Sequence, residues 1–592
     1  MSNPPSPYGL SPYVHLVENR LAPPVIGYGA FHQLSGEVLE IHAELMPLMV
    51  HLKVGQKLML REEERRSAAA QPGPIGWLLE KEFIVPAEQD PLASFTNHYV
   101  VRPVQNPALA HTSVDGLLRL TRINMSQRLF SPHRDDLPPI IEEVMDELAA
   151  EIFLQADGTK TLQEIFEKMK RGAGGTLLQE RAFRDTLERL TRPDRQLIKL
   201  APRRENLADP YQPFNTVLRD LAHTSKAGEP AQGSGATETV KEFHLTGIED
   251  AWWEFDFIEP TINHCFRFPS DVFGGLDYAS RFCLSALKPE VLPSLRSATT
   301  QLRVLEIGGG TGTFAKSFIE QAARLSTSSL AGRELSYHIV ELSPALMMNQ
   351  QGLLADCQPP VTHFQQDATE LDLHGREFDL MIANEVIADF PVASVSRVRQ
   401  PEEAHDGELA HPGRRWEGEG AVYVEKYRLP VEDAPDSFLV HAGVFQFLER
   451  AWKHLSKGGA LILTEYGSER QYPVRAYHLN HEEFAIHFAQ VAACATSIGF
   501  TCRLLTLREF LEADDSVPIL NGREEHLRCL NHVLQKYGAS LPFAAISERE
   551  FQERCGPLAE RINLIGPTFS PLRTGFHYGP DFNEFMVLSL HK

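Results

Sequence analysis

The chain has 592 residues, 43% of them hydrophobic and 23% charged. This is the composition of an ordinary globular protein, and the length exceeds what a single hydrophobic core usually fills. The net charge of −22 argues against nucleic acid as the main partner, because phosphate binding needs clustered Lys and Arg. The sequence contains no run of about 18 apolar residues, so we expect no membrane span. The seven cysteines are scattered and form no C-x-x-C pair, so we expect reduced thiols in a cytoplasmic protein.

The N-terminal half contains two stretches in which several predicted helices precede a short hairpin. The first helices of the two stretches are predicted at 38–45 and 142–154. In the second stretch, Thr161 followed by Glu164 predicts a capping box at the start of another helix. Three helices followed by a hairpin is the order of a winged helix. We therefore expect a mainly α, winged-helix-like N-terminal region.

The segment from Asp157 to Ile165 resembles the PqqD-like winged helices that grip leader peptides in peptide-modifying enzymes. The resemblance implies that the N-terminal region recruits a polypeptide substrate. A region that serves only for structure or for dimerisation, with the chain as a homodimer, is the alternative. DNA binding is disfavoured, because the predicted helix 181–192 mixes acidic residues with its arginines and lacks a basic face.

A break in composition follows at 226–236, whose small, polar, Pro- and Gly-rich residues cannot bury a core. A second charged, Gly-rich stretch indicates an insertion in the C-terminal half. The predicted organisation is two winged-helix-like regions, a linker and a C-terminal domain with an insertion, at 1–130, 131–225, 226–240, 241–592 and 393–422 respectively.

The apolar run 302–307 predicts a buried strand that turns through evenly spaced glycines into an amphipathic helix; these are Gly308, Gly310 and Gly312. Such a turn lets a ligand approach bare backbone near the helix N-terminus. A dinucleotide fingerprint would need a third glycine at position 313, which is Thr313. Together with Glu306, the glycines resemble the first motif of class I S-adenosylmethionine (SAM) methyltransferases. The pattern favours SAM over NAD.

Three further predicted strands end on polar side chains, in the order that this fold requires. The Glu341 carboxylate can accept hydrogen bonds from both ribose hydroxyls of the cofactor. In this fold Asp367 lies beside the adenine and accepts from its amino group, and Asn384 holds the amino-acid end of the donor. The resemblance implies an α/β, Rossmann-like, doubly wound methyltransferase domain, with SAM bound by Glu306, Gly308, Gly310, Gly312, Glu341, Asp367 and Asn384.

Within this class the C-terminal half resembles the MidA/NDUFAF-seven family, which includes a mitochondrial protein-arginine methyltransferase. The resemblance spans residues 300–592 and departs from the family in two places. Ala388 stands where the family usually has Asp, with Asp389 displaced by one, and Glu465 replaces another Asp. The resemblance implies an arginine nitrogen of a protein as the methyl acceptor. The segments that carry it are 306–310, 339–344, 383–392, 415–417, 464–467, 481–484 and 582–588.

Methyl transfer from a sulfonium depends mainly on alignment of the acceptor. Glu385, at the end of the fourth strand, is the first catalytic candidate, because a carboxylate can hold a guanidinium through two parallel hydrogen bonds. Asp389 is the second, by its place in the family-like element; helix capping is the alternative role of both. His481 stands where the family has a histidine, which implies a pocket-lining role. His481 and His487 lie six residues apart, which is not zinc-motif spacing, so we expect no metal.

These observations predict a SAM-dependent methyltransferase that modifies a protein or peptide side chain, with arginine nitrogen as the first choice. Two alternatives remain open from the sequence. One is a natural-product methyltransferase that acts on a small molecule. The other is a SAM-binding assembly factor or scaffold with little turnover.

Overall fold

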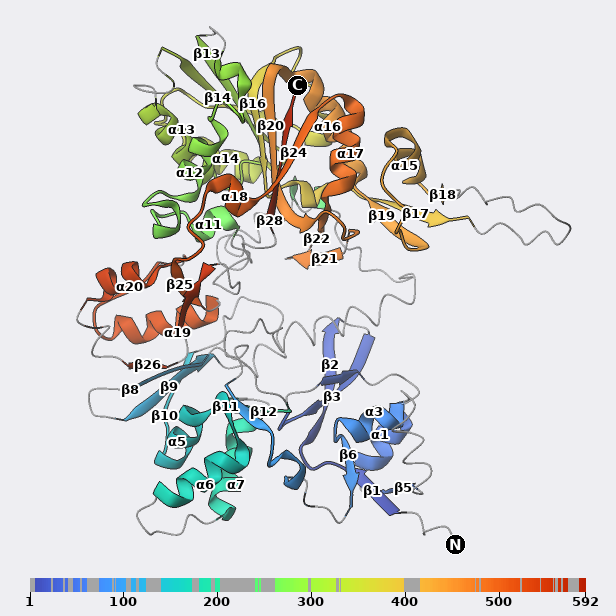
Figure 1. Ribbon diagram of the computed structural model, residues 1–592, viewed down its shortest axis with the longest axis vertical. Helices are drawn as coiled ribbons and strands as arrows, with labels where there is room; N and C mark the ends of the chain where they lie inside the picture. Colours follow the sequence, from blue (N-terminus) through green and yellow to red (C-terminus); the bar gives the residue numbers. More distant parts are fainter. Residues whose placement is uncertain are drawn as a thin grey trace, which may run out of the picture. The chain divides into compact units, whose positions relative to one another are not determined.

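The computed structural model of the protein (Figure 1) describes residues 6–592 apart from a set of gaps, and every structural statement below concerns the described residues. The gaps are residues 23–24, 36–37, 41–45, 54–55, 61–73, 88–89, 91, 103–107, 113–116, 124–139, 173–179, 193–196, 203–239, 243, 246–260, 297–299, 326–329, 331, 399–415, 474, 479–480, 522–523, 543–544, 557, 559–562, 566–567 and 573–584. The predicted linker 226–240 therefore lies almost wholly outside the described residues.

The chain forms two compact units, and each is discontinuous in sequence. The first unit takes in two segments from after residue 520, which differs from the continuous domain predicted at 241–592. The reason is strand pairing: β26 (Asn563–Ile565) pairs with β8 (Ala108–Thr112) at the edge of a sheet in the first unit. A division of the first unit near residue 130 stays a prediction. The first unit comprises 1–233, 521–541 and 552–568, and the second 234–520, 542–551 and 569–592.

The first unit contains small antiparallel sheets with helices beside them. The sheet orders are β5-β1-β6, β2-β3-β4, β10-β9-β8-β26 and β11-β7-β12. Its strands are β1 (Ser6–Leu10), β2 (Val14–Ala22), β3 (Val25–His32), β4 (Val38–Glu40), β5 (Leu58–Leu60), β6 (Ile84–Pro86), β7 (Tyr99–Val101), β8, β9 (Leu118–Ile123), β10 (Ile140–Val144), β11 (Asp157–Thr161), β12 (Lys199–Ala201) and β26. Its helices include α1 (Met46–Lys53), α3 (Pro74–Glu80), α5 (Glu147–Gln155), α6 (Leu162–Gly172), α7 (Glu180–Thr191) and α19 (Glu524–Gln535).

The expected mainly α, winged-helix-like region is not confirmed, because strands replace parts of the predicted helices. Where a helix was expected at 38–45, β4 occupies 38–40 and pairs with β3. A short apolar run fits a strand as well as a helix, and here the neighbouring strand decides. Where a helix was expected from residue 142, β10 runs to Val144. Helix α5 begins only after Asp146, whose carboxylate caps it by accepting from the Ala149 amide at 2.8 Å.

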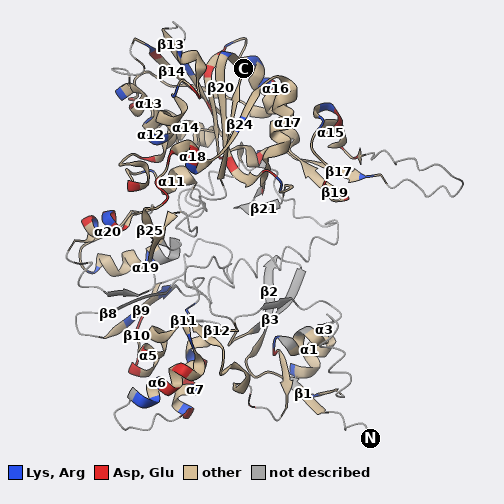
Figure 2. Cartoon of the chain, in the orientation of Figure 1, with Lys and Arg blue, Asp and Glu red and all other residues tan. Residues whose placement is uncertain are grey.

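The predicted capping box before α6 is confirmed. The Thr161 amide donates to Glu164 Oε2 at 2.8 Å, and the Glu164 amide donates to Thr161 Oγ1 at 3.3 Å. Helix α7 carries acidic and basic residues together (Figure 2), and Arg184 is paired with both Glu180 and Asp90. The helix therefore presents mixed charge.

The second unit is built on a sheet of order β15-β14-β13-β16-β20-β28-β24. The strands from β15 to β20 are parallel, and β28 is antiparallel to both of its neighbours. The central strands β13, β16 and β20 carry near-continuous apolar runs, as strands buried on both faces do. The strands are β13 (Gln301–Ile307), β14 (Glu334–Glu341), β15 (Thr362–Gln365), β16 (Phe378–Asn384), β20 (Leu455–Ser468), β24 (Thr501–Thr506) and β28 (Phe585–His591).

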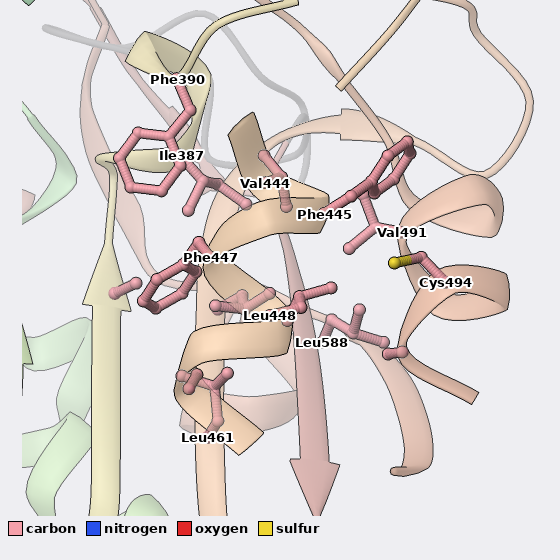
Figure 3. Close-up of a cluster of buried hydrophobic side chains, with 14 of the residues drawn as sticks. Ile387, Phe390, Val444, Phe445, Phe447, Leu448, Leu461, Val491, Cys494 and Leu588 are labelled. Atoms are coloured by element: carbon pink, nitrogen blue, oxygen red, sulfur yellow. The ribbon is translucent and has the colours of Figure 1, made fainter. Parts of the chain in front are cut away.

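Helices cover both faces of this sheet (Figure 1). Helices α12 (Tyr278–Ala286), α13 (Thr313–Leu325) and α14 (Pro344–Leu353) lie on one side, and α16 (Ala442–His454) and α17 (Phe488–Ile498) on the other. The core beneath α16 and α17 includes Phe447, Leu448, Val491 and Leu588, all fully buried (Figure 3). None of the described helices has the length and apolarity needed to span a bilayer.

Smaller elements complete the second unit and its junctions. The predicted insertion 393–422 contains β17 (Ala393–Arg397) and β18 (Trp416–Glu417), which form a sheet with β19 (Ser437–Val440). The remaining elements are α9 (Val240–Glu242), α11 (Ile262–Cys265), α15 (Ala421–Tyr427), α18 (Leu507–Leu511), α20 (Glu548–Cys555), β21 (Arg475–His478), β22 (His481–Phe484), β23 (Ile486–His487), β25 (Pro518–Asn521), β27 (Thr568–Pro571), and the short 3₁₀ turns η5 (Ala368–Glu370) and η6 (Ile387–Asp389).

Candidate active site

The glycine loop joins β13 to α13, as the sequence predicts. The amide of Gly308 donates to the Val340 carbonyl of β14 at 2.8 Å, which fixes the start of the loop. Gly308, Gly310 and Gly312 all have positive φ, the conformation that favours glycine. At Gly310 a Cβ would meet no atom within 4 Å, so the loop borders open space there. Bare backbone beside open space at a helix N-terminus suits the amino-acid end or ribose of SAM.

Glu341 ends β14 with a buried carboxylate. Its Oε1 accepts from the Ser343 amide at 3.0 Å, and its Oε2 accepts from Gln350 Nε2 at 2.9 Å. Burial raises the pKa of this carboxyl, and the two donors oppose that rise. Each carboxylate oxygen accepts one of these bonds, which leaves further acceptor capacity for the ribose hydroxyls.

Asp367 follows β15 and caps η5. Its Oδ1 accepts from the amide and hydroxyl of Thr369, at 2.9 and 2.7 Å. Its Oδ2 accepts from Lys241 Nζ at 2.8 Å. Burial opposes ionisation of Asp367, but these donors outweigh it and lower its pKa. Because Lys241 lies on α9, a segment soon after the predicted linker reaches the carboxylate that the resemblance assigns to the adenine.

Asn384 ends β16 at the middle of the sheet edge. Its Oδ1 accepts from the Tyr278 hydroxyl at 2.6 Å and from Thr464 Oγ1 at 2.7 Å. Its Nδ2 then points to Glu385 Oε1, at 3.2 Å. Since Tyr278 is fully buried on α12 and Thr464 lies on β20, three elements fix the Asn384 amide.

Glu385 has a backbone φ of +51°, which is uncommon for a residue with a side chain. This conformation turns its carboxylate toward α11, where both oxygens accept from the Ile262 amide at 3.1 and 3.0 Å. Burial raises the Glu385 pKa to about 7, against the lowering effect of the Ile262 and Asn384 donors. This contact differs from the capping after a strand that the sequence left as an alternative, because α11 precedes β13 in the chain and has Thr261 as its N-cap residue.

Glu465, at the end of β20, lies near Glu385 and Glu483. Its carboxylate is buried and accepts from the amides of Ala388 and Tyr466, at 3.2 and 3.0 Å. Burial is the main cause that raises its pKa well above the usual range, and the charges of Glu385 and Glu483 add to the rise. The carboxyl ends of β16 and β20 therefore bring together acids that repel one another.

The other three predicted site residues, Asp389, Glu306 and His481, lie in different surroundings. Asp389 lies in η6 with its Oδ2 3.4 Å from His244 Nε2. Glu306 is buried, and its Oε2 accepts from the Tyr337 hydroxyl at 3.0 Å; a direct contact of Glu306 with the cofactor stays a prediction. The backbone of His481 begins β22, where it pairs with His478, and its side chain lies outside the described residues.

The structure adds residues that the sequence did not indicate: Tyr278, Thr464, Ile262, Gln350, Lys241 and His244. Their partners in the site lie between 9 and 145 residues away along the chain. No local spacing rule covers such contacts, so only the fold could reveal them.

Comparisons with known proteins agree with this geometry. Residues 288–483 match a protein family described as "Putative S-adenosyl-L-methionine-dependent methyltransferase". A search of curated proteins finds no match to this chain.

Solved structures with a similar fold include two from Burkholderia thailandensis, both described as members of one protein superfamily. One is 17% identical, covers 61% of this chain and 95% of that chain, and has a TM-score of 0.32. The other, bound to S-adenosyl-homocysteine, is 16% identical over the same shares of the two chains, with a TM-score of 0.30. A SAM-dependent methyltransferase from Clostridium acetobutylicum is 10% identical over 39% of this chain and 85% of that chain, with a TM-score of 0.23.

The second unit has the mixed α/β sheet of the class I SAM-dependent methyltransferases. The protein is a SAM-dependent methyltransferase, and SAM is its cofactor. The narrower resemblance to the MidA/NDUFAF-seven family is not confirmed by these comparisons.

Proposed function

We propose that the enzyme methylates a protein or peptide side chain, with an arginine nitrogen as the acceptor. The observation that carries this proposal is the gathering of Glu385, Glu465 and Glu483 at the carboxyl ends of β16 and β20 and on β22. Each of Glu385 and Glu465 has its pKa raised by burial first, and then by the neighbouring acids. A cation placed among these carboxylates would relieve the repulsion and favour their ionised forms.

A guanidinium suits such a place better than an ammonium, because its planar array of N–H donors reaches several acceptors at once. The Glu385 carboxylate already accepts from the Ile262 amide and the Asn384 side chain. It therefore has room for one further N–H donor, and the remaining guanidinium bonds would fall to Glu465 or Glu483. This arrangement differs from the two-bond grip by Glu385 alone that the sequence predicts.

Bound SAM supplies an electrophilic methyl group on a sulfonium. The carboxylates hold the acceptor nitrogen in line with that methyl group, and Glu385, with a pKa about 7, is suited to take up the proton that the nitrogen loses after transfer. The N-terminal unit is proposed to recruit the polypeptide. None of the seven cysteines, all of which the structure describes, forms a disulfide, and this supports a cytoplasmic location.

The test uses Glu385→Gln in the full-length enzyme, with radiolabelled methyl transfer into arginine-containing peptides. We expect SAM affinity to be nearly intact while turnover falls by about 100-fold or more, because charge-assisted pairing with the acceptor is lost. Glu334→Gln is the matched control, since Glu334 is exposed at the start of β14, at the other end of the sheet.

Three results would contradict the proposal. Equal losses of SAM binding and turnover would place Glu385 in the donor site. Transfer to a neutral small molecule in preference to every peptide would favour the natural-product alternative. SAM binding without methyl transfer to any protein or compound of a lysate would favour the scaffold alternative.

A further inference from the structure

Gln350, on α14, contacts two separate parts of the donor site. Its Nε2 donates to the Gly310 carbonyl at 2.8 Å and to Glu341 Oε2 at 2.9 Å. Both partners are acceptors only, so the nitrogen and not the oxygen of the amide must face them. The side chain is fully buried, which leaves the amide one orientation.

The glycine loop lies directly on this side chain. A Cβ at Gly309 would come within 2.9 Å of Gln350 Nε2, and a Cβ at Gly312 within 3.3 Å of Gln350 Cα and Cγ. Two glycines of the loop are therefore needed for the close approach to Gln350. This close approach explains why residue 309 is a glycine, although the Glu-x-Gly-x-Gly-x-Gly motif allows any residue at that position.

The hydrogen bond from Gln350 to the Gly310 carbonyl also fixes the direction of the Thr311 backbone N–H. In a trans peptide the C=O and the N–H point in opposite directions. The Gly310 carbonyl points to Gln350, so the Thr311 N–H points away from α14. The neighbouring Asn349 Nδ2 donates to the Thr311 carbonyl at 3.1 Å, which holds the next peptide in the same way.

We propose that Gln350 is the positioning residue of the donor site, whose single amide group locks the glycine loop and the Glu341 carboxylate into one arrangement that SAM requires. This inference concerns SAM binding and does not depend on the identity of the acceptor.

The same hydrogen bond affects the charge of Glu341. Burial raises the pKa of this carboxyl, while the Ser343 amide and the Gln350 amide lower it. The charge of His244 favours the ionised form of Glu341. The charge of Glu341 in turn raises the pKa of the neighbouring Glu306, whose own burial is the larger cause. Without the Gln350 donor the pKa of Glu341 rises further. The ionised form of Glu341 binds ribose hydroxyls better than the protonated form does. As the pH is lowered, the variant should therefore lose SAM affinity at a higher pH than the wild type.

The experiment measures SAM affinity by titration calorimetry between pH 5 and 9 in the full-length protein. Gln350→Met nearly keeps the length of the side chain but removes the whole amide group, including both N–H donors. We expect the dissociation constant at pH 7 to rise about tenfold or more, with the pH at which affinity falls moved upward. The KM for SAM should rise while kcat at saturating SAM stays unchanged.

Two further variants define the comparison. Gln351→Met makes the same chemical change at an exposed position of the same helix and should bind SAM as the wild type does. Glu341→Ala should remove the pH dependence that is due to Glu341. Wild-type affinity in Gln350→Met would overturn the proposal. Weakened binding with an unmoved pH profile would also overturn it, because a loosened fold lowers affinity without changing how Glu341 titrates.

Gln350→Glu provides an independent test if Gln350→Met does not fold. At low pH the introduced carboxyl is protonated and can donate to Glu341, whereas at high pH two carboxylates repel. Its loss of SAM affinity relative to the wild type should shrink as the pH falls. A loss that is constant or grows toward low pH would overturn the proposal.

Discussion

Glu306 and Glu341 end neighbouring strands, yet their carboxylates meet different surroundings. Glu341 has neutral donors and a glycine loop beside it, whereas Glu306 is buried against the Tyr337 hydroxyl. Burial, with a contribution from Glu341, raises the Glu306 pKa to about 8. The acid that the methyltransferase motif carries in its first strand therefore titrates in the core of this protein.

The raised Glu306 pKa predicts a pH-dependent stability. A carboxyl with a folded pKa above its unfolded value of 4.5 contributes stability that is fully present below that value and is lost as the pH rises through about 8. Glu306→Gln cannot titrate, so we expect it to gain stability relative to the wild type between pH 5 and 8. The measurement is the midpoint of thermal unfolding of the SAM-binding unit at several pH values. That transition is recognised because added SAM shifts it, and Glu334→Gln serves as the control. A difference between variant and wild type that does not change with pH would contradict the Glu306 pKa.

For individual site residues, the sequence predicts some and misses others for a physical reason. Glu341 and Asn384 are predictable because they end strands that the sequence pattern reveals, and Gly310 is predictable because it lies in the loop just after such a strand. Tyr278 and Gln350 are not, because each acts through a partner that the fold alone brings near. Glu385 is an intermediate case: its place at the strand end is readable, but its capture by the α11 amide is not.

Among the elements, the central parallel strands are the most predictable, because burial on both faces makes β13, β16 and β20 nearly continuous apolar runs. The segment at 38–40 was predicted as a helix and is a strand, since three residues are too few to show a period and pairing with β3 decides. The start of α5 was predicted too early because the Asp146 cap, and not the apolar pattern, sets it.

Strand β28 predicts a test of the sheet's core. Leu588 is fully buried among the side chains of α16 and α17 (Figure 3). We expect Leu588→Ala to destabilise the SAM-binding unit by about 2–5 kcal/mol, the range for a large-to-small change in a core. Val422→Ala, at an exposed position of α15, should change stability little. Chemical denaturation with SAM binding as the signal measures both, and equal effects would contradict the burial of β28.

For the whole molecule, the composition of 226–236 predicts that limited proteolysis cuts there first. The two pieces should nevertheless stay together after cleavage. The C-terminal piece carries β26, which pairs with β8, and α19, whose Lys536 forms an ion pair with Glu142 of β10. Size-exclusion chromatography of the cut protein should give one peak that contains both fragments. Elution as two separate peaks would contradict the discontinuous first unit.

The discontinuous units also bear on how the protein is made. During translation a chain emerges from its N-terminal end, and domains usually fold in that order. Here the first unit lacks β26 and α19 until residues beyond 520 have been synthesised, and the central sheet of the second lacks β28, which lies between β20 and β24. Neither unit can therefore complete its fold until the last part of the chain has been synthesised. The first 500 residues must remain in an unfinished state with exposed strand edges, so we expect this protein to depend on holding chaperones more than one whose domains fold in sequence.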